Sequence, residues 1–162
     1  MNEGGTMLTF EPVREEDFEA MADLRAEALH DSLQHLGRFD PVRVRERLRD
    51  AFVPACMRHI VRDGRRVGYL TLIAQAPAAE LRLHHLYLRP GEQGLGIGAW
   101  ALDWVKAQAR AQQRDVTLCA LRESPANRFY VRHGFRVVKE LPFDLEYRWS
   151  PAATDHVAGE VP

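Results

Sequence analysis

The stretch LYLRPGEQGLGIGAWAL, residues Leu86–Leu102, decides how this chain folds. An apolar segment runs through a glycine-rich turn and continues directly into a helix-forming segment. Gly94, Gly96 and Gly98 allow the backbone to curl so that successive N–H groups point into one concavity, and the positive N-terminal end of the helix adds to it. The stretch therefore predicts a strand, a turn that binds an anion with several oxygens, and a helix.

Two kinds of cofactor site use such a turn. The first is a dinucleotide site, because Gly94-x-Gly96-x-x-Ala99 fits G-x-G-x-x-G/A, and Asp115 follows at about the spacing of the acid that binds the ribose. Asp115, however, precedes the next predicted strand, Val116–Leu121, whereas the ribose acid belongs at the far end of a strand. Too few residues follow for the further strand–helix units of a doubly wound domain, so the context disfavours this alternative.

In the second kind of site, the turn QGLGIG of residues 93–98 resembles the pyrophosphate loop Gln/Arg-x-x-Gly-x-Gly/Ala of the GCN5-related N-acetyltransferase (GNAT) superfamily. A second block, Leu121–Phe135, is similar to the other cofactor segment of that family and ends in its Tyr-x-x-x-Gly-Phe signature. The resemblance covers about residues 7–149 and is strongest over 80–138. It implies transfer of an acetyl group from acetyl-CoA to a primary amine by direct attack in a ternary complex.

Composition agrees with an enzyme of one domain. The 162 residues are 46% hydrophobic, which suffices for a single core, and no apolar run approaches the length that spans a membrane. A net charge of −1 provides no overall field to recruit nucleic acid or a membrane surface. The expected partner is a small-molecule or peptide amine, with the chain a monomer or homodimer. The excess of Arg over Lys indicates GC-rich, bacterial coding rather than phosphate binding.

The cysteines and the two ends of the chain give an expectation about the cellular compartment of the protein. Cys56 and Cys119 stand isolated in apolar surroundings, which predicts buried free thiols and a reducing environment. Met1–Thr6 lacks the features of a signal peptide and is expected to be a flexible lead, as Ser150–Pro162 is a flexible tail, around an acetyltransferase domain at 7–149. The cytoplasm is therefore expected. The histidines show no ligand spacing, so no metal is expected.

Periodicity and turn residues predict the order βααβββαβαββ. The predicted strands are Met7–Val13, Met57–Arg62, Val67–Ala76, Glu80–Leu88, Val116–Leu121, Phe135–Val138 and Leu145–Trp149. The predicted helices run over Phe18–His30 with Asp17 as N-cap, from Pro41 to Pro54 with Val42, Val44, Leu48 and Phe52 buried, over 97–113, and from Ser124-Pro125 to Gly134. The fold class is α/β (α+β). The resemblance implies a mixed central sheet, opened into a V, with helices on both faces.

The cofactor clamp is expected in the backbone of Gln93–Ala99, where the N–H of Gln93 matters more than its side chain. The residues that the resemblance assigns to the cofactor are Leu86, Tyr87, Leu88, Gln93, Gly94, Leu95, Gly96, Ile97, Gly98, Ala99, Asn127, Phe129 and Tyr130. Asn127 would meet the pantetheine chain. The sequence departs from the family pattern at Ser124, because the family often carries Asn near that helix start.

Tyr130 aligns with the catalytic Tyr of the family. A phenol remains protonated at neutral pH, so a helix-borne Tyr near the thioester sulfur can act as the acid for the departing thiolate. The alternative is a Tyr that only packs in the core under its helix.

The base is expected on the strand 80–88, whose alternation places Arg82, His84 and Leu86 on one face. Many relatives carry Glu at the position of His84, and the arylalkylamine N-acetyltransferases carry His, so the resemblance nominates His84 as acceptor of the amine proton, through water. An imidazole suits this task at neutral pH. A structural, hydrogen-bonded His is the alternative, and Glu80 is the reserve base.

A different function also fits the sequence: a domain that binds acetyl-CoA or CoA as a sensor, without turnover. Both Tyr130 and His84 argue against it. Nothing in the sequence names the acceptor, whose specificity is expected from Asp31–Asp40, the turn near Pro77 and Leu141–Asp144.

Overall fold

In this computed structural model, residues 5–74 and 80–151 are described. They form two compact units, one of residues 5–71 with 85–101 and the other of the described residues of 72–84 with 102–151. The expected turn near Pro77 and all but the start of the expected tail lie outside the described residues, as does most of the expected lead.

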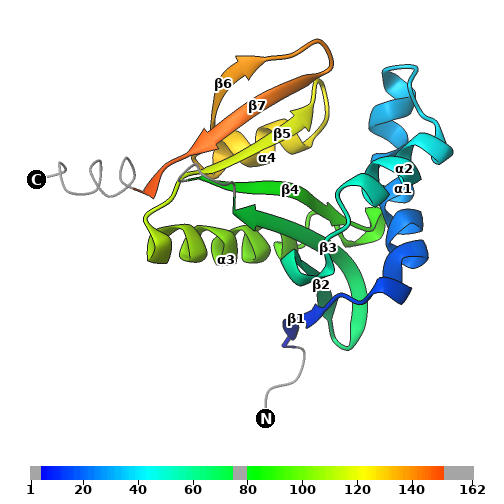
Figure 1. Cartoon of the computed structure of the whole chain (residues 1–162), viewed down its shortest axis with the longest axis horizontal. Coiled ribbons are helices and arrows are strands. Elements are labelled where there is room, and N and C mark those ends of the chain that lie inside the picture. The colour runs from blue at the N-terminus through cyan, green and yellow to red at the C-terminus, as the bar shows by residue number, and fades with distance from the viewer. Residues whose placement is uncertain (1–4, 75–79, 152–162) are drawn as a thin grey trace, which may run out of the picture. The chain divides into compact units, whose positions relative to one another are not determined.

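The predicted order of elements is confirmed (Figure 1). The strands are β1 (Leu8–Pro12), β2 (Met57–Arg62), β3 (Arg65–Ala74), β4 (Leu81–Leu88), β5 (Val116–Leu121), β6 (Arg136–Glu140) and β7 (Asp144–Trp149). The helices are α1 (Phe18–His35), α2 (Pro41–Asp50), α3 (Ile97–Gln112) and α4 (Ala126–Arg132), with short 3-10 turns at Glu15–Asp17, Pro54–Cys56 and Pro90–Glu92. The strands follow the order β1-β2-β3-β4-β5-β7-β6 in a mixed, mostly antiparallel sheet, which confirms the α/β class.

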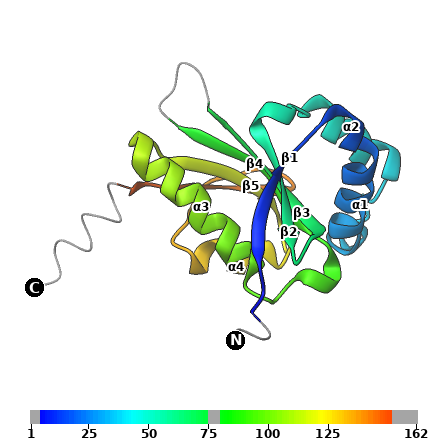
Figure 2. The ribbon, with the colours of Figure 1, turned by 90° about the horizontal axis from the view of Figure 1, so that it is seen from below.

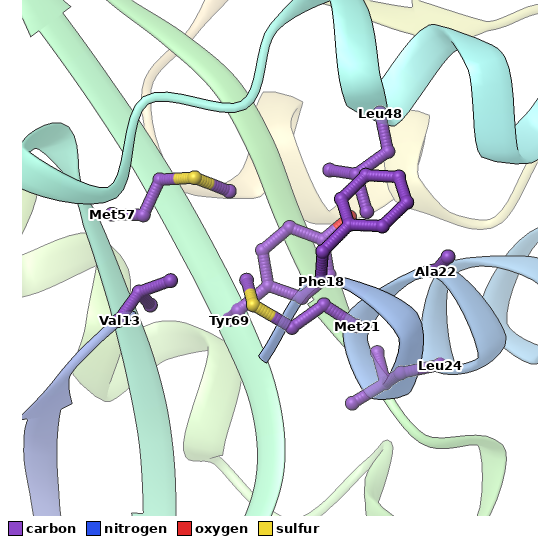
Figure 3. Packing of buried hydrophobic residues seen from close by; sticks show 8 residues of the cluster. All are labelled: Val13, Phe18, Met21, Ala22, Leu24, Leu48, Met57 and Tyr69. Carbon is purple, nitrogen blue, oxygen red and sulfur yellow. The ribbon is translucent and has the colours of Figure 1, made fainter. Parts of the chain in front are cut away.

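In the first unit, α1 and α2 lie together on one side of β1, β2 and β3 (Figure 2). Their apolar faces pack on the strands in one buried cluster (Figure 3): Val13, Phe18, Met21, Ala22, Leu24, Leu48, Met57 and Tyr69. Phe10 of β1, which pairs with Ile60, stacks on Trp100 of α3 with ring centroids 4.6 Å apart. Met57 and Ile60 lie three residues apart on β2 and so point to opposite faces, which means that helices cover both faces here.

Several predictions on these helices are wrong. The helix α1 continues to His35 rather than stopping at His30, and Gly37, just beyond the C-cap residue Leu36, supplies the left-handed turn with its φ of 69°. In α2, Val44 and Leu48 are buried as expected, but Val42 is exposed, because two residues separate it from Val44 by about 200° around the helix. The helix ends at Asp50 rather than at Pro54, so the partly buried Phe52 lies beyond it.

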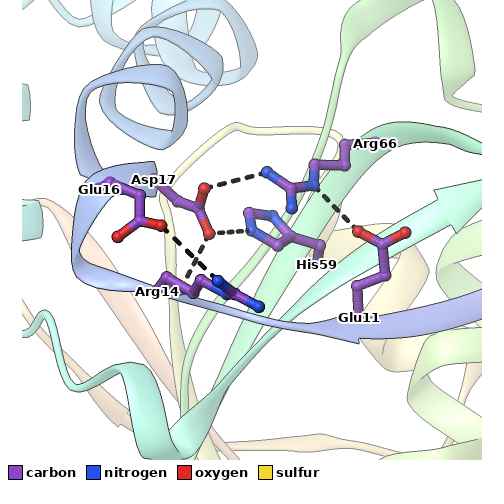
Figure 4. Close-up of polar contacts among 6 residues, drawn as sticks. All are labelled: Glu11, Arg14, Glu16, Asp17, His59 and Arg66. Carbon is purple, nitrogen blue, oxygen red and sulfur yellow. Dashed lines mark hydrogen bonds and ion pairs between the residues drawn. The ribbon is translucent and has the colours of Figure 1, made fainter.

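Asp17 does not cap α1 with its side chain, contrary to the prediction. Its carboxylate accepts hydrogen bonds from His59 Nε2 at 2.9 Å, from Arg66 Nη1 at 3.0 Å and from the backbone N–H of Arg14 at 2.9 Å (Figure 4). Burial alone would raise the pKa of Asp17, but these hydrogen bonds and the charge of Arg66 outweigh it and lower the pKa from 3.8 to about 2. Asp17 thus ties the start of α1 to β2 and β3.

The low pKa of Asp17 predicts an acid-sensitive contribution to stability. Since the folded pKa lies below the unfolded value, the stabilisation is complete above about pH 4 and is lost as the pH falls toward 2. We expect Asp17→Asn to remove roughly 1–2 kcal/mol of this pH-dependent unfolding free energy. Urea titrations at pH 2 to 7 measure it. Glu16→Gln, at a neighbouring exposed carboxylate, is the control, and parallel stability–pH curves for wild type and Asp17→Asn would contradict the expectation.

Gly68 of β3 allows an unusually close approach to β4. A Cβ atom built on Gly68 would lie 2.2 Å from the carbonyl oxygen of Tyr87 and 2.7 Å from Cδ2 of Leu88, and real side chains do not tolerate such distances. The N–H of Arg89 donates to Val67 O at 2.9 Å just beyond this point. The end of β4 therefore lies against β3 at a distance that only glycine allows, and nothing in the sequence indicated this role for Gly68.

In the second unit, β5, β7 and β6 form an antiparallel ribbon (Figure 1), and the beginning of β4 pairs in parallel with β5 through Leu81–Val116 and Arg82–Thr117. One face of this sheet is apolar and buried; it carries Leu81, Leu83, Val116, Leu118, Tyr147 and Trp149. Lys106 and Arg110 of α3 lie over the ring of Trp149 at 5.3 and 5.2 Å. The opening between β4 and β5 beyond these pairs stays a prediction.

Three further predictions need correction or detail. Pro125, not Ser124, occupies the N-cap position of α4, and neither side chain caps the helix; Gly134, with φ of 89°, ends it as expected. Both cysteines are free thiols, but Cys119 is exposed and Cys56 half-buried. At the start of the expected tail, Ser150 Oγ donates to Asp115 at 2.6 Å.

Among the residues described, we find no helix whose length and apolar character would suffice to cross a membrane.

Candidate active site

The glycine turn of the first unit has the geometry of an anion-binding nest. Gly94 and Gly96 adopt φ of 79° and 81°, a left-handed conformation that glycine reaches without strain. α3 then begins at Ile97, and the N–H groups of its first turn have no partners within the helix. A Cβ atom at Gly94 or Gly96 would meet no atom within 4 Å, so the turn borders open space. Alternating left-handed backbone before a helix start is the arrangement that binds phosphate.

Gln93, which precedes the nest, is hydrogen-bonded within the protein. The N–H of Gln93 donates to Pro90 O at 3.4 Å, and its side-chain Nε2 donates to Leu88 O at 3.3 Å. Both groups therefore have partners within the protein, which does not support the expected role of the Gln93 N–H. The side chain of Ile97 is buried at 1% exposure, so only its backbone can serve a cofactor, whereas Leu95 is exposed.

The end of β4 in the first unit is held by aromatic packing. His85 is buried, its Nδ1 lies 2.8 Å from Thr71 Oγ1, and its ring packs against Tyr69 and Tyr87. The guanidinium of Arg25 lies over the Tyr87 ring at 5.7 Å and donates to Val44 O. The backbone of Leu86–Leu88, expected to meet the cofactor, is thereby positioned by α1, α2 and β3.

In the second unit, Tyr130 lies at 7% exposure on α4. Its ring packs against Phe129, Phe135 and Tyr147, with centroids 5.2, 5.6 and 6.0 Å away. Lys106 Nζ donates to the carbonyl of His133 at the end of the helix. The ring of Tyr130 thus has the surroundings of a core residue, as the alternative interpretation expected, and the packing also fixes the position of its hydroxyl.

Asn127 lies one turn before Tyr130 and is engaged in an internal network. Its Nδ2 donates to Leu121 O at 2.8 Å and Ser124 O at 3.0 Å, and its Oδ1 accepts from Tyr147 Oη at 2.7 Å. The turn that it holds contains Glu123, a non-glycine residue with φ of 64°. These bonds make Asn127 the residue that fixes the end of β5 to the start of α4; its predicted contact with a pantetheine chain is not tested.

His84 and Glu80 differ in their surroundings. His84 is exposed on β4, and removal of water from part of its ring, followed by the positive charge of Arg82, lowers its pKa below the ordinary value of 6.5. Its imidazole is therefore neutral at physiological pH and able to accept a proton. The carboxylate of Glu80 instead pairs with Arg148 Nη2 at 2.8 Å, and Arg148 also binds Asp115 at 2.6 Å. This ion-pair network favours a structural role for Glu80.

The predicted site residues therefore fall in two groups. Leu86–Leu88 and the nest belong to the first unit, whereas Glu80, His84, Asn127, Phe129 and Tyr130 belong to the second.

Sequence reasoning missed two residues of the second unit, Tyr147 and Arg148. It placed Arg82 on the same strand face as His84 but gave it no role. The sequence carries no signal for Tyr147 or Arg148, because their partners are 20 to 68 residues away.

Within residues 5–74 and 80–151, no group of three or more His, Cys, Asp or Glu side chains is arranged to hold a metal ion.

Comparison with known proteins gives both family and fold. The family model described as "Acetyltransferase (GNAT) domain" matches residues 56–137, just over half of the chain. No curated protein matches the chain in sequence. Among solved structures, the PaiA N-acetyltransferase of Thermoplasma acidophilum, in complex with coenzyme A, is 16% identical with a TM-score of 0.72, and the match covers 89% of this chain and 99% of that one. An acetyltransferase of Thermus thermophilus is 24% identical with a TM-score of 0.69, over 88% and 96%.

Proposed function

This chain belongs to the GNAT acetyltransferase family, and on that premise we propose that it transfers the acetyl group of acetyl-CoA to a primary amine. The observation that carries the proposal is the nest at Gly94–Gly96, whose left-handed backbone opens onto free space before the start of α3. Such a nest suits the pyrophosphate of coenzyme A. The similar fold of a protein in complex with coenzyme A supports this cofactor.

The residues of the second unit supply the acid and base of the reaction. The ammonium group of the acceptor gives one proton to His84, directly or through water, and the neutral amine attacks the thioester carbon. A C–N bond forms and the C–S bond breaks. The departing thiolate takes a proton from the Tyr130 hydroxyl, which recovers one from the nitrogen of the product. The proton on His84 returns to solvent, so the cycle yields an amide, CoA and one proton.

Gly96→Val should weaken acetyl-CoA binding by about 10- to 100-fold, because the β-branched side chain fills the space before the nest and strains a backbone with φ of 81°. Titration calorimetry measures the binding. Gly64→Val is the matched control: Gly64 also has a positive φ, of 82°, and open space, but it lies in the β2–β3 turn. Equal affinity for Gly96→Val and wild type would place the cofactor elsewhere.

The test of the function is CoA thiol release, followed in the presence of acetyl-CoA and a panel of primary amines. We expect amine-dependent release and a mass shift of the amine to its acetyl form. Binding of acetyl-CoA without release for any amine would instead support the second candidate, a sensor of acetyl-CoA. The presence of a neutral His84 and a fixed Tyr130 favours the enzyme.

A further inference from the structure

Arg82 and His84 are neighbours on one face of β4. They lie two residues apart in the strand, so their side chains point the same way from Cα atoms about 6.5 Å apart. Arg82 pairs with Thr117 of β5, and Cys119 pairs with Glu146 of β7, which brings Arg82, Cys119 and Glu146 together on that face. It is the polar face of the second unit, opposite the apolar face that carries Tyr147 and Trp149.

The two contacts of the Arg82 guanidinium are both weak. Its Nη2 donates to the Sγ of Cys119 at 3.1 Å, and a thiol is a weak acceptor. Its Nη1 lies 3.8 Å from Glu146 Oε1, which is an ion pair beyond hydrogen-bond distance. The side chain is only 22% exposed, so its charge is less screened than that of a surface arginine. Neither of these two contacts is the bidentate carboxylate pair that a guanidinium favours.

We propose that Arg82 binds a carboxylate of the acceptor, so that the acceptor is a small amino acid with its amino and carboxylate groups a few bonds apart. The proposal rests on the acetyltransferase function proposed above. With the carboxylate on the two Nη atoms of Arg82, the amino group of such a molecule reaches toward His84, one side chain along the same face. Arg82 is near enough for its charge to act on His84. An amine without a carboxylate lacks this anchor.

Cys119 offers a test that does not depend on turnover. Cys119 is an exposed residue and its sulfur lies 3.1 Å from Arg82 Nη2, so a carboxylate bound to Arg82 would lie against the thiol. In a Cys56→Ser background, Cys119 is the single thiol of the chain. We would measure its alkylation by iodoacetamide with CoA present, adding either amino acids or the corresponding amino acid amides. The reaction is run at pH 8.5, because burial raises the pKa of the Cys119 thiol and only the thiolate reacts.

We expect at least one amino acid to slow alkylation several-fold while its amide does not. Arg82→Gln should abolish this protection. Protection is expressed as the ratio of the alkylation rates with and without the amino acid, because the substitution also alters the rate of the unprotected thiol. Arg136→Gln, at an exposed arginine of β6, is the control and should retain it. Equal protection by an amino acid and its amide, no protection by any amino acid, or protection that survives Arg82→Gln would overturn the proposal.

Kinetics distinguish the proposal from the function on which it rests. For an acetylated amino acid, Arg82→Gln should raise KM about 10- to 100-fold, while kcat/KM for the matching amide stays within a factor of about three. Acetylation of amino acids and amides at equal rates would refute the carboxylate site and leave the acetyltransferase function standing. Protection of Cys119 without any acetyl transfer would refute the acetyltransferase function and leave the carboxylate site standing.

Discussion

The His84→Ala enzyme should lose about 10²- to 10⁴-fold in turnover at neutral and lower pH, where the amine most needs a base, and keep its affinity for acetyl-CoA. The wild-type rate depends on a neutral imidazole, and the pKa of His84 is lowered from 6.5 by removal of water and by Arg82. The acid limb of the wild-type pH–rate profile should therefore lie below pH 6.5, whereas the rate of the variant should rise at higher pH, with the fraction of free amine. At high pH, where the free amine is abundant, the two enzymes should converge.

Initial rates over pH 5 to 10 measure this expectation. Glu80→Gln is the contrasting variant, because Glu80 is the other base that the sequence offers but its carboxylate is bound to Arg148. We expect that variant to keep the acid limb. Turnover of His84→Ala within a factor of about two of wild type across pH 6 to 9 would make His84 structural.

The second large effect concerns Tyr130→Phe, which should lower kcat by about 10- to 1,000-fold while the KM for acetyl-CoA changes much less. The substitution deletes one hydroxyl and keeps the ring that packs on Phe129, Phe135 and Tyr147. A proton donor to the sulfur stabilises charge that appears only as the C–S bond breaks, so its loss belongs in kcat.

Tyr69→Phe is the matched control for this variant. The hydroxyl of Tyr69 is buried in the first unit and has no hydrogen-bond partner among the described residues, so its removal should leave fold and turnover intact. A rise in KM for acetyl-CoA with kcat spared in Tyr130→Phe would assign the hydroxyl to binding. No change in either constant would make Tyr130 a core residue only.

The order of elements was predictable because its signals are local. Strand alternation, Asp63-Gly64 at the β2–β3 turn and the glycines after β4 each act within a few residues, and Asp63 and Gly64 adopt the positive φ expected of that turn. The bounds of β2 and β5 are as predicted. The true end of α1 could also have been predicted, since Gly37 is the next glycine after the helix.

What the sequence did not predict depends on distant partners. Asp17 looks like an N-cap by its position, but His59 and Arg66, more than 40 residues away, take its carboxylate. The exposure of Cys119 is an exception, because it follows from local alternation: Cys119 stands next to the buried Leu118 on β5, and period two puts the thiol on the polar face. The network of Tyr147 and Asn127 likewise arises only when β7 lies beside β5.

The central claim is tested most directly by initial rates of CoA release measured while acetyl-CoA and an active amine are both varied. The account predicts no release above background without amine, and reciprocal plots that intersect, because the acetyl group passes directly to the amine while both substrates are bound. Release at the same rate without amine, or parallel plots together with an acetyl group on the protein, would contradict it, since these are the marks of hydrolysis and of a covalent intermediate.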